Sequence, residues 1–247
     1  MKKFSLFVLS LLTLASCQQS IWNDIEAGFQ SYDDYQSRCA FLLQQGRNVA
    51  DIACLVADGS VSEVCDSVMP EGYSWEAVTA SSLMSQAKVV DNKLVLANGN
   101  EYSLLVLPKQ ETMNLELLEC IYKFEQQGLI VAGSIPEQFS EDMEAMTVPE
   151  GVSLETVLLN MGIMPDFFGG GYDNNLEFVH RTLGKDGDIF FLSNQNDKDL
   201  EIYPEFRVED ATSTQIWDPV TGEIHAWQEE TLKLSALQSV FVVFSKD

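Results

Sequence analysis

Basic side chains are scarce in this sequence. Its 247 residues include 14 Lys and Arg against 38 Asp and Glu, which gives a formal net charge of −24. A protein that holds nucleic acid neutralises phosphates with clustered basic residues, so this balance excludes DNA and RNA as partners. With 46% hydrophobic and 21% charged residues, the rest of the composition is that of a globular chain and excludes a disordered or collagen-like protein.

The motifs of common cofactors and nucleophiles are also missing. The sequence has no Gly-x-Gly-x-x-Gly, Gly-Lys-Ser/Thr or Gly-x-Ser-x-Gly loop, and the glycines at 169–171 are interpreted as a hinge. It has no Cys-x-x-Cys pair, and its two histidines, His180 and His225, are far from every cysteine in sequence. We therefore expect no cofactor, no metal site and no cysteine nucleophile.

A hydrophobic run at residues 4–14 follows two lysines at the N-terminus. This pattern is typical of a secretory signal, and the run is too short to span a membrane. The end of the run and the residues after it, Leu14-Ala15-Ser16-Cys17, resemble a bacterial lipobox. We expect residues 1–17 to be a lipoprotein signal peptide and lipobox, with Cys17 as the lipid attachment site. The mature protein would then be exported to the cell envelope and anchored to the lipid bilayer, in the outer membrane or at the periplasmic face. A plain signal peptide with a chance cysteine is the alternative.

Four cysteines remain, and an exported chain can pair them. They are Cys39, Cys54, Cys65 and Cys120. Four cysteines allow three pairings, and the sequence does not choose among them. Cys54 lies in the apolar run 52–56, so it is interpreted as a core residue.

The first half of the chain alternates between helical patterns and short apolar runs. Residues 22–45 have apolar side chains at steps of three or four, which predicts one helix ended by Gly46. Further along, apolar runs at 49–57, 103–108 and 129–133 alternate with helical patterns at 75–86 and 114–127. This order predicts parallel βαβ units, and thus an α/β three-layer domain of flavodoxin-like or amidotransferase-like type over residues 47–168.

After Gly171 the hydrophobic period changes to two. Seven short strand-like segments are separated by turns and lie at 176–182, 188–193, 200–208, 214–217, 224–227, 231–234 and 239–244. Regularly spaced short strands predict a β-sandwich over residues 172–247.

An acidic segment connects the two halves. Between Lys123 and Arg181 there are ten acidic residues and no basic one. Four of its carboxylates are candidates for a glycosidase acid and base: Glu137, Glu141, Asp142 and Glu144. A solvated acidic face is the commoner role of such a run.

Other polar and aromatic residues have structural interpretations. The Asn and Asp clusters at 173–175 and 196–199 lack a twelve-residue calcium loop and are typical of turns. Trp217 is interpreted as a core residue, and Trp227 is open between the core and sugar stacking.

Several segments together resemble the C-terminal, post-barrel region of glycoside hydrolase family 106, the α-L-rhamnosidases. They lie at 35–39, 43–52, 70–73, 104–108, 178–181, 188–195, 217–224 and 239–244. The resemblance implies that residues 21–46 correspond to the last helix of a (β/α)₈ barrel. Catalytic carboxylates of such enzymes lie in that barrel, and a barrel needs roughly 200 residues or more. We therefore assign no catalytic residue, and His180, Arg181 and Trp217 have structural or interdomain roles.

The expected function is that of a lipid-anchored, truncated rhamnosidase-like homologue without glycosidase activity of its own. It would be an accessory in glycan breakdown that binds a rhamnose-containing glycan or a partner glycosidase. Two alternatives remain open: an active glycosidase that uses the acidic segment, and an unrelated sugar-binding lipoprotein. Without a barrel, Trp22, Phe29, Tyr32 and Phe41 are expected to fold back on the α/β domain or to form an exposed apolar patch.

Overall fold

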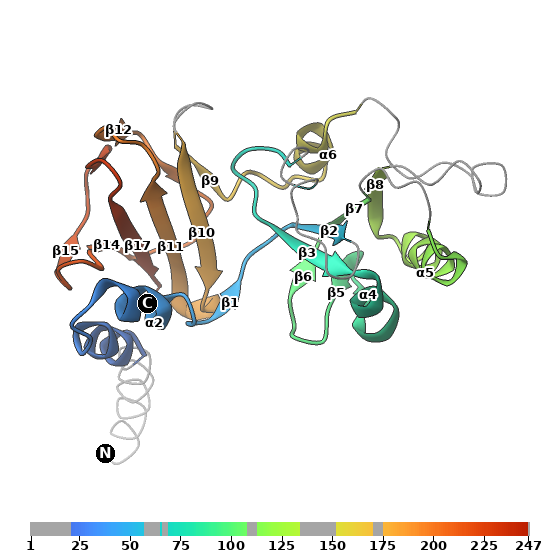
Figure 1. Ribbon diagram of the computed structural model, residues 1–247, viewed down its shortest axis with the longest axis horizontal. Helices are drawn as coiled ribbons and strands as arrows, with labels where there is room; N and C mark the ends of the chain where they lie inside the picture. The colour runs from blue at the N-terminus through green and yellow to red at the C-terminus, as the bar shows by residue number, and fades with distance from the viewer. Residues whose placement is uncertain are drawn as a thin grey trace, which may run out of the picture. The chain divides into compact units, whose positions relative to one another are not determined.

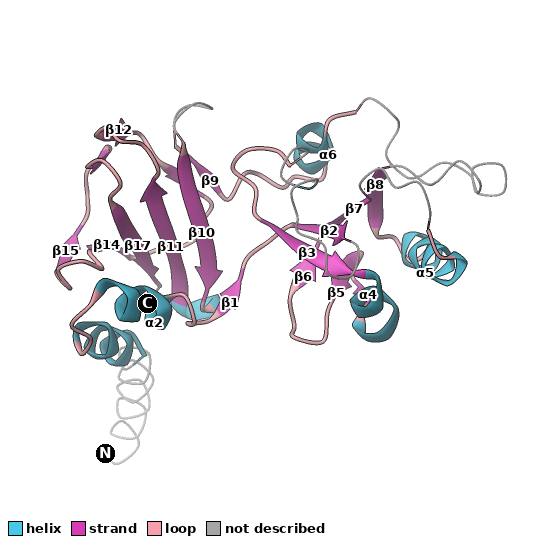
Figure 2. Cartoon of the chain, viewed as in Figure 1, coloured by secondary structure: helices cyan, strands magenta, loops and turns pink. Residues whose placement is uncertain are grey.

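The computed structural model describes residues 21–56, 65, 69–107, 113–133, 152–169 and 175–246. The chain divides into two compact units (Figure 1). The α/β unit is Val49–Asp166, and the β unit combines Met1–Asn48 with Phe167–Asp247. Figure 2 shows helices mixed with strands in the first and mainly strands in the second. Residues 1–17, with Cys17, and the carboxylates at 137–144 lie outside the described residues.

A parallel sheet forms the centre of the α/β unit, with the order β3-β2-β7-β8. Its strands are β2 (Ile52–Val56), β3 (Trp75–Thr79), β7 (Leu104–Leu107) and β8 (Ile130–Gly133). Along β2, Ala53 and Leu55 lie in one buried cluster, and Ile52 and Cys54 lie in another. Successive side chains of a strand point to opposite faces, so the sheet is buried on both sides. That burial explains why the two central strands, β2 and β7, are apolar throughout.

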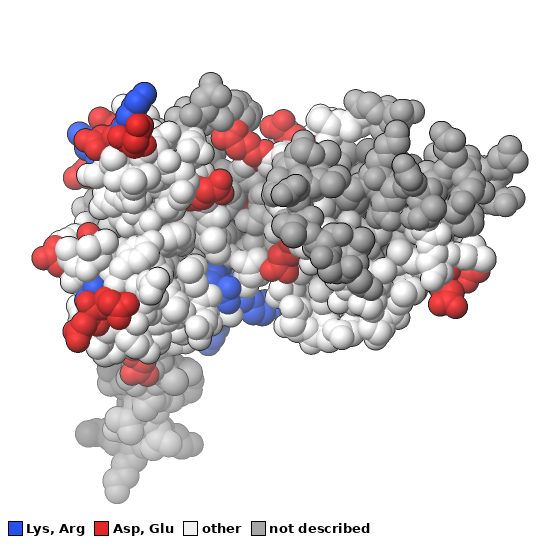
Figure 3. All heavy atoms as spheres, in the orientation of Figure 1, with Lys and Arg blue, Asp and Glu red and all other residues white. Residues whose placement is uncertain are grey.

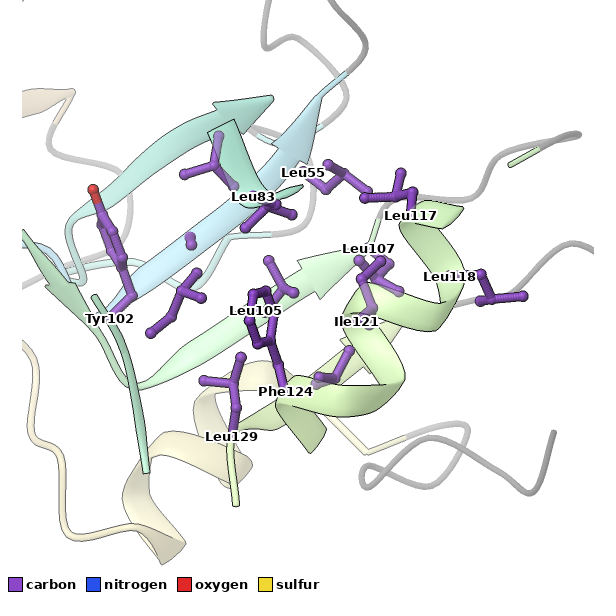
Figure 4. Packing of buried hydrophobic residues seen from close by; sticks show 14 of the residues in the cluster. Leu55, Leu83, Tyr102, Leu105, Leu107, Leu117, Leu118, Ile121, Phe124 and Leu129 are labelled. Atoms are coloured by element: carbon purple, nitrogen blue, oxygen red, sulfur yellow. The ribbon is translucent and has the colours of Figure 1, made fainter. Parts of the chain in front are cut away.

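Helices contribute to both buried clusters. The close view in Figure 4 shows α5 (Leu115–Gln126) directing Leu117, Ile121 and Phe124 toward the cluster that contains Leu55 and Leu83 of α4 (Ala80–Gln86). On the other face, α6 (Leu154–Asn160) contributes Val157 and Leu158. Three antiparallel strands form a small separate sheet: β4 (Lys88–Val90), β5 (Lys93–Val95) and β6 (Glu101–Tyr102). The mixed α/β organisation predicted from the sequence is present.

The helix predicted over residues 75–86 is wrong in its first half. Residues 75–79 form β3, which pairs in parallel with β2, and α4 begins at Ala80. Trp75 and Val78 favour a strand because aromatic and β-branched side chains fit a pleated surface. Thr79 then acts as the helix cap, since its side chain accepts a hydrogen bond from the Ser82 amide at 3.2 Å.

A disulfide joins Cys54 to Cys65, which is one of the pairings that the sequence left open. Both residues are fully buried, as predicted for Cys54. Cys39 and Cys120 are free thiols. The bridge therefore ties β2, at the centre of the sheet, to a residue 11 positions further along the chain.

A six-stranded antiparallel sheet forms the β unit, in the order β1-β10-β11-β17-β14-β15. Its strands are β1 (Arg47–Asn48), β10 (Leu176–Thr182), β11 (Gly187–Asn194), β14 (Ser213–Trp217), β15 (Ile224–Ala226) and β17 (Ser239–Ser245). Two small sheets pair β12 (Leu200–Ile202) with β16 (Leu232–Leu234), and β9 (Phe167–Phe168) with β13 (Glu205–Phe206). The period-two pattern thus predicted the antiparallel strands of this half, although β9, directly before Gly169, was not expected.

Each face of the large sheet has its own cover. Phe190 and Val242 face a cluster that includes Ile202, Leu232 and Phe167 from the small sheets. The opposite side chains of β11 and β17 face the N-terminal helices. This second cluster contains Ile25, Phe29, Cys39, Leu42, Ile189, Trp217, Phe241 and Val243. The sandwich is therefore completed by a helical layer.

The single helix expected over residues 21–46 is interrupted. Residues 21–30 are helical, and α2 (Tyr35–Leu42) begins after a turn. Asp34 caps α2, because its carboxylate accepts hydrogen bonds from the Ser37 amide at 2.9 Å and the Ser37 hydroxyl at 2.7 Å. The same bonds, with the backbone one first, lower the pKa of Asp34. The break between the helices follows from this cap.

These two helices pack on the sheet of the β unit. Phe29 is fully buried, with its ring 5.1 Å from that of Trp217, and the Trp22 indole donates to the Asp186 carbonyl at 2.8 Å. For Phe29, both expected alternatives, packing on the α/β domain and an exposed apolar patch, are therefore wrong, because it is buried within the β unit. In the part of the chain that the structure describes, no helix has both the length and the apolar character needed to cross a membrane.

Reduction of the Cys54–Cys65 bridge is expected to destabilise the α/β unit by about 2–4 kcal/mol, because it frees a closed loop in the unfolded chain. Thermal melting with and without reductant measures this loss, and Cys65→Ser should reproduce it. Cys120→Ser, which removes a free thiol, is the control. A melting curve unchanged by both reductant and Cys65→Ser would contradict the pairing.

Phe29→Ala is expected to destabilise the β unit by about 3–5 kcal/mol, because it leaves a cavity under the sheet. Tyr32→Ala in the same segment should cost much less, since Tyr32 is 40% exposed. Hydrogen exchange of β11 and β17, followed by mass spectrometry, measures the change in that unit. Equal protection in the two variants would show that the helix does not support the sheet.

Candidate functional site

The β unit has an open groove of about 490 Å³ beside its N-terminal helices. The groove is lined by Ile21, Asp24, Ile25, Phe41, Gln45, Gly46 and Leu183. Its lining is mainly apolar and includes one carboxylate, that of Asp24. Glycosidases typically use two carboxyl groups that flank the scissile bond, and Asp24 is the one carboxylate among the residues that line this groove.

Arg181 fixes one end of the groove. From β10, its Nε donates to the Gln45 carbonyl at 2.6 Å and its Nη2 donates to the Gly46 carbonyl at 2.9 Å. Gly46 has a φ of +56°, and a Cβ there would lie 2.2 Å from the Thr182 carbonyl oxygen. Glycine is therefore required where the chain leaves α2, which agrees with the predicted helix stop.

Arg38 connects α2 to the loop between β14 and β15. It is buried, and its Nη1 donates to the carbonyls of Pro219 at 3.0 Å and Val220 at 2.8 Å. Its guanidinium lies 5.9 Å from the centre of the Phe29 ring. Gly222 completes the contact, because a Cβ there would approach Arg38 to 2.9 Å. Two segments that carry the family resemblance thus meet in space.

His180 belongs to a buried ionic network. Its Nε2 lies 3.3 Å from Oδ1 of Asp188, and Nζ of Lys246 lies 2.9 Å from Oδ2 of the same carboxylate. The imidazole stacks on Phe190 with ring centres 4.0 Å apart. Burial would raise the pKa of Asp188, but the hydrogen bonds from His180 and Lys246 outweigh it and lower that pKa. His180 has no access to a substrate, since it is 4% exposed.

The free cysteines are unsuited to nucleophilic chemistry. Burial raises the pKa of the Cys39 thiol and that of the Cys120 thiol, so both remain protonated near neutral pH. Cys120 lies within α5 and its sulfur is 3.9 Å from the Leu83 carbonyl. These surroundings suit a structural role for Cys120.

The more buried carboxylates of the α/β unit also have structural partners. Glu76 accepts hydrogen bonds from the Tyr102 hydroxyl and the Asn100 amide. Burial and the Glu76 bond raise the pKa of Tyr102. Asp166 is fully buried and accepts a hydrogen bond from the Ser74 amide at 3.1 Å. Each of them stabilises the fold where it lies.

The Asn and Asp clusters at 173–175 and 196–199 form turns where they are described. Residues 173 and 174 lie outside the described residues, and the Asn175 amide donates to the Gln195 carbonyl. Asn196 bonds to Asn194, and Asp199 accepts from the Ala236 amide. No group of three or more His, Cys, Asp or Glu suited to a metal occurs among the described residues.

The two tryptophans of the β half also have defined places. Trp217 is 1% exposed, which confirms its assignment to the core. Trp227 is partly buried, lies edge-on to Phe206 and donates to the Thr231 carbonyl at 3.4 Å. It too supports the sandwich core.

Sequence reasoning missed Arg38, Asp188 and Lys246. A signal existed for Arg38, because a basic residue within the helical apolar pattern of an acidic chain needs a partner when it is buried. Asp188 and Lys246 are 58 residues apart and become neighbours through the pairing of β11 with β17. No local sequence pattern predicts that two such distant strands pair.

Because the pKa of Asp188 is lowered in the folded protein, the stability of the β unit depends on pH in the acid range. The stabilising network is complete above the unfolded carboxyl pKa near 4 and is lost as pH falls through the lower folded value. We expect the unfolding free energy of this unit to fall in that acid range, and Asp188→Asn to flatten the fall. Denaturant unfolding from about pH 2 to about pH 6 tests this, since that range includes the unfolded carboxyl pKa near 4 and extends well below it. Asp197→Asn, at an exposed turn, is the control, and an unchanged acid slope in Asp188→Asn would refute the assignment.

Comparison with known proteins places these features in a family. The family model of glycoside hydrolase family 106, described as alpha-L-rhamnosidase, matches residues 12–147 and 138–230. The structure of a rhamnosidase from Novosphingobium sp. PP1Y superposes with a TM-score of 0.71 and 26% identity, over 86% of this chain and 24% of that chain.

Two other proteins resemble the chain. A curated protein of Formosa agariphila named "Putative beta-glucuronidase" is 28% identical over an alignment 246 residues long, which covers 87% of this chain and 21% of that protein. A β-galactosidase from Bacillus circulans sp. alkalophilus shares the fold alone, with a TM-score of 0.51 and 10% identity over 83% of this chain and 43% of that chain. The chain spans less than a quarter of the length of the rhamnosidase and of the Formosa relative. Because the family model matches most of its residues, the chain belongs to glycoside hydrolase family 106.

Proposed function

We propose that this chain is a lipid-anchored accessory in glycan breakdown, which binds carbohydrate or a partner glycosidase and does not hydrolyse glycosidic bonds itself. The observation that carries the proposal is the arrangement of its carboxylates. Among the described residues, the buried carboxylates are Asp166 and Asp188, which both have structural partners, and Asp24 is the one carboxylate that lines the groove. A glycosidase acid and base would need two carboxyl groups facing one substrate.

The fold of the described residues supports the same proposal. The parallel strands in the described residues number four and form an open sheet, whereas a catalytic (β/α)₈ barrel closes eight. Numbered in chain order, this sheet runs 2-1-3-4, which is the start of the flavodoxin-like order 2-1-3-4-5. We therefore assign the α/β unit to the flavodoxin-like or amidotransferase-like type, as a post-barrel domain.

Export and anchoring are part of the proposal. Residues 1–17 have the pattern of a lipoprotein signal, with Cys17 as the lipid attachment site in the cell envelope. The Cys54–Cys65 disulfide supports export, because disulfides persist in oxidising compartments and are rare in the cytosol.

An active glycosidase is the second candidate, and membership of a hydrolase family favours it. Its acid and base would come from Glu137, Glu141, Asp142 and Glu144, which lie outside the described residues.

Hydrolysis of an aryl α-L-rhamnoside by the purified full chain separates the two candidates. We expect no more release than from a control chain in which Glu137, Glu141 and Glu144 are changed to Gln and Asp142 to Asn. Retention on a rhamnose-containing glycan or on a glycosidase from the same cell should be the same in both chains. Release that the control chain has lost would overturn the accessory role.

A further inference from the structure

A row of polar side chains crosses three neighbouring strands of the β unit. Glu177 of β10 lies directly opposite Ser193 of β11, and Ser193 lies directly opposite Ser239 of β17. Residues directly opposite each other point to the same face of a sheet, and neighbouring strands are about 4.8 Å apart. A carboxylate and two hydroxyls therefore lie in line, on the face that the N-terminal helices cover in part.

The hydrogen bonds of this row leave one hydroxyl hydrogen without an acceptor in the described part of the chain. The Tyr35 hydroxyl donates to Ser239 at 3.2 Å, and the Gln195 amide donates to Ser193 at 2.7 Å. The two serine oxygens are 3.0 Å apart, so one serine donates to the other. Each hydroxyl has a single hydrogen, so the serine that accepts in that bond keeps its own. Ser239 is 6% exposed and Ser193 is half-buried, so this hydrogen is available to a ligand when Ser193 is the acceptor.

Apolar side chains lie next to this row. One step along the strands, Val179 is opposite Phe191, and both are only half-buried. Phe241, opposite Phe191 in the next strand, is fully buried beneath the helices. Tyr35, at the start of α2, is 39% exposed. The helices thus cover the sheet as far as Phe241 and leave Val179 and Phe191 partly open beside the polar row.

We propose that this surface, the polar shelf (Tyr35, Glu177, Val179, Phe191, Ser193 and Ser239), binds the ring of a neutral sugar. The proposal rests on the carbohydrate-binding role proposed above and gives that role a place. A sugar hydroxyl can donate to the Glu177 carboxylate and accept the available serine hydrogen. The C–H face of the ring then lies on Phe191 and Val179. Both kinds of contact are needed to recognise a molecule that has hydroxyls and an apolar face.

Charge decides which sugars fit. Glu177 is exposed and makes no hydrogen bond or ion pair with another described residue. The chain carries a net charge of −24, and the face drawn in Figure 3 has more acidic than basic side chains. A carboxylated or sulfated sugar would be repelled at such a site. The ligand class is therefore a neutral pyranose.

Calorimetric titration of the full chain with methyl α-L-rhamnoside and with the anionic methyl β-D-glucuronide tests the shelf. We expect saturable binding of the rhamnoside and at least tenfold weaker binding of the glucuronide (about 1.4 kcal/mol). Glu177→Gln and Ser193→Ala should each weaken rhamnoside binding about fivefold. Glu177→Gln should also reduce the discrimination against the glucuronide.

Glu201→Gln changes an exposed strand carboxylate elsewhere in the β unit and is the control. Melting curves of all variants check that each is folded.

Three outcomes decide the matter. Rhamnoside binding that is weakened by both shelf variants and not by the control supports the site. Equal binding by every variant overturns the shelf and leaves a carbohydrate-binding role at another surface. If the unmodified chain binds neither this glycoside nor any glycan on an array, both the shelf and a carbohydrate-binding role are refuted.

Discussion

The β unit depends on the burial of its central strands on both faces. Strands β11 and β17 alternate between two clusters, and β17 is buried along nearly its whole length. An antiparallel sheet of this kind is stable only when a second layer excludes water from each apolar face. The small sheets cover one face, and residues 21–30 with α2 cover the other. The N-terminal helices are therefore required by the sheet, whatever role the corresponding helix has in longer relatives.

The polar contacts of the β unit follow from that packing. Arg38 can reach the carbonyls of Pro219 and Val220 because Phe29 and Leu42 fix the helices on the sheet. Arg181 holds the carbonyls that follow α2 in a similar way. Hydrogen bonds from a charged donor to a carbonyl are stronger than those between neutral groups. They specify the position of the helices, while the apolar contacts provide most of the stability.

Much of the fold could be predicted from local patterns. The hydrophobic period of two predicted the strands of the β half, and the continuous apolar runs predicted β2, β7 and β8. Each pattern reflects how many faces of a strand are buried. Two helix boundaries were wrong. The pattern at residues 22–45 has the right spacing for one helix, yet the Asp34 cap breaks it. The sequence of Trp75–Thr79 is compatible with a strand or a helix, and its pairing with β2 makes it a strand. The ionic network of Asp188 and the pairing of Cys54 depend on distant residues, so no local pattern reports them.

In the sequence, the α/β unit is inserted between two segments of the β unit. The strands that flank the insertion both pair within the β unit, β1 with β10 and β9 with β13. During synthesis, residues 21–48 emerge more than a hundred positions before β11 and β17. Phe29 is therefore synthesised long before Trp217 and Phe241, the aromatic residues against which it packs. Contacts over such separations form slowly. Until β17 has been made, the apolar side chains of the N-terminal helices lack the sheet that covers them. During that time the incomplete chain is most exposed to aggregation.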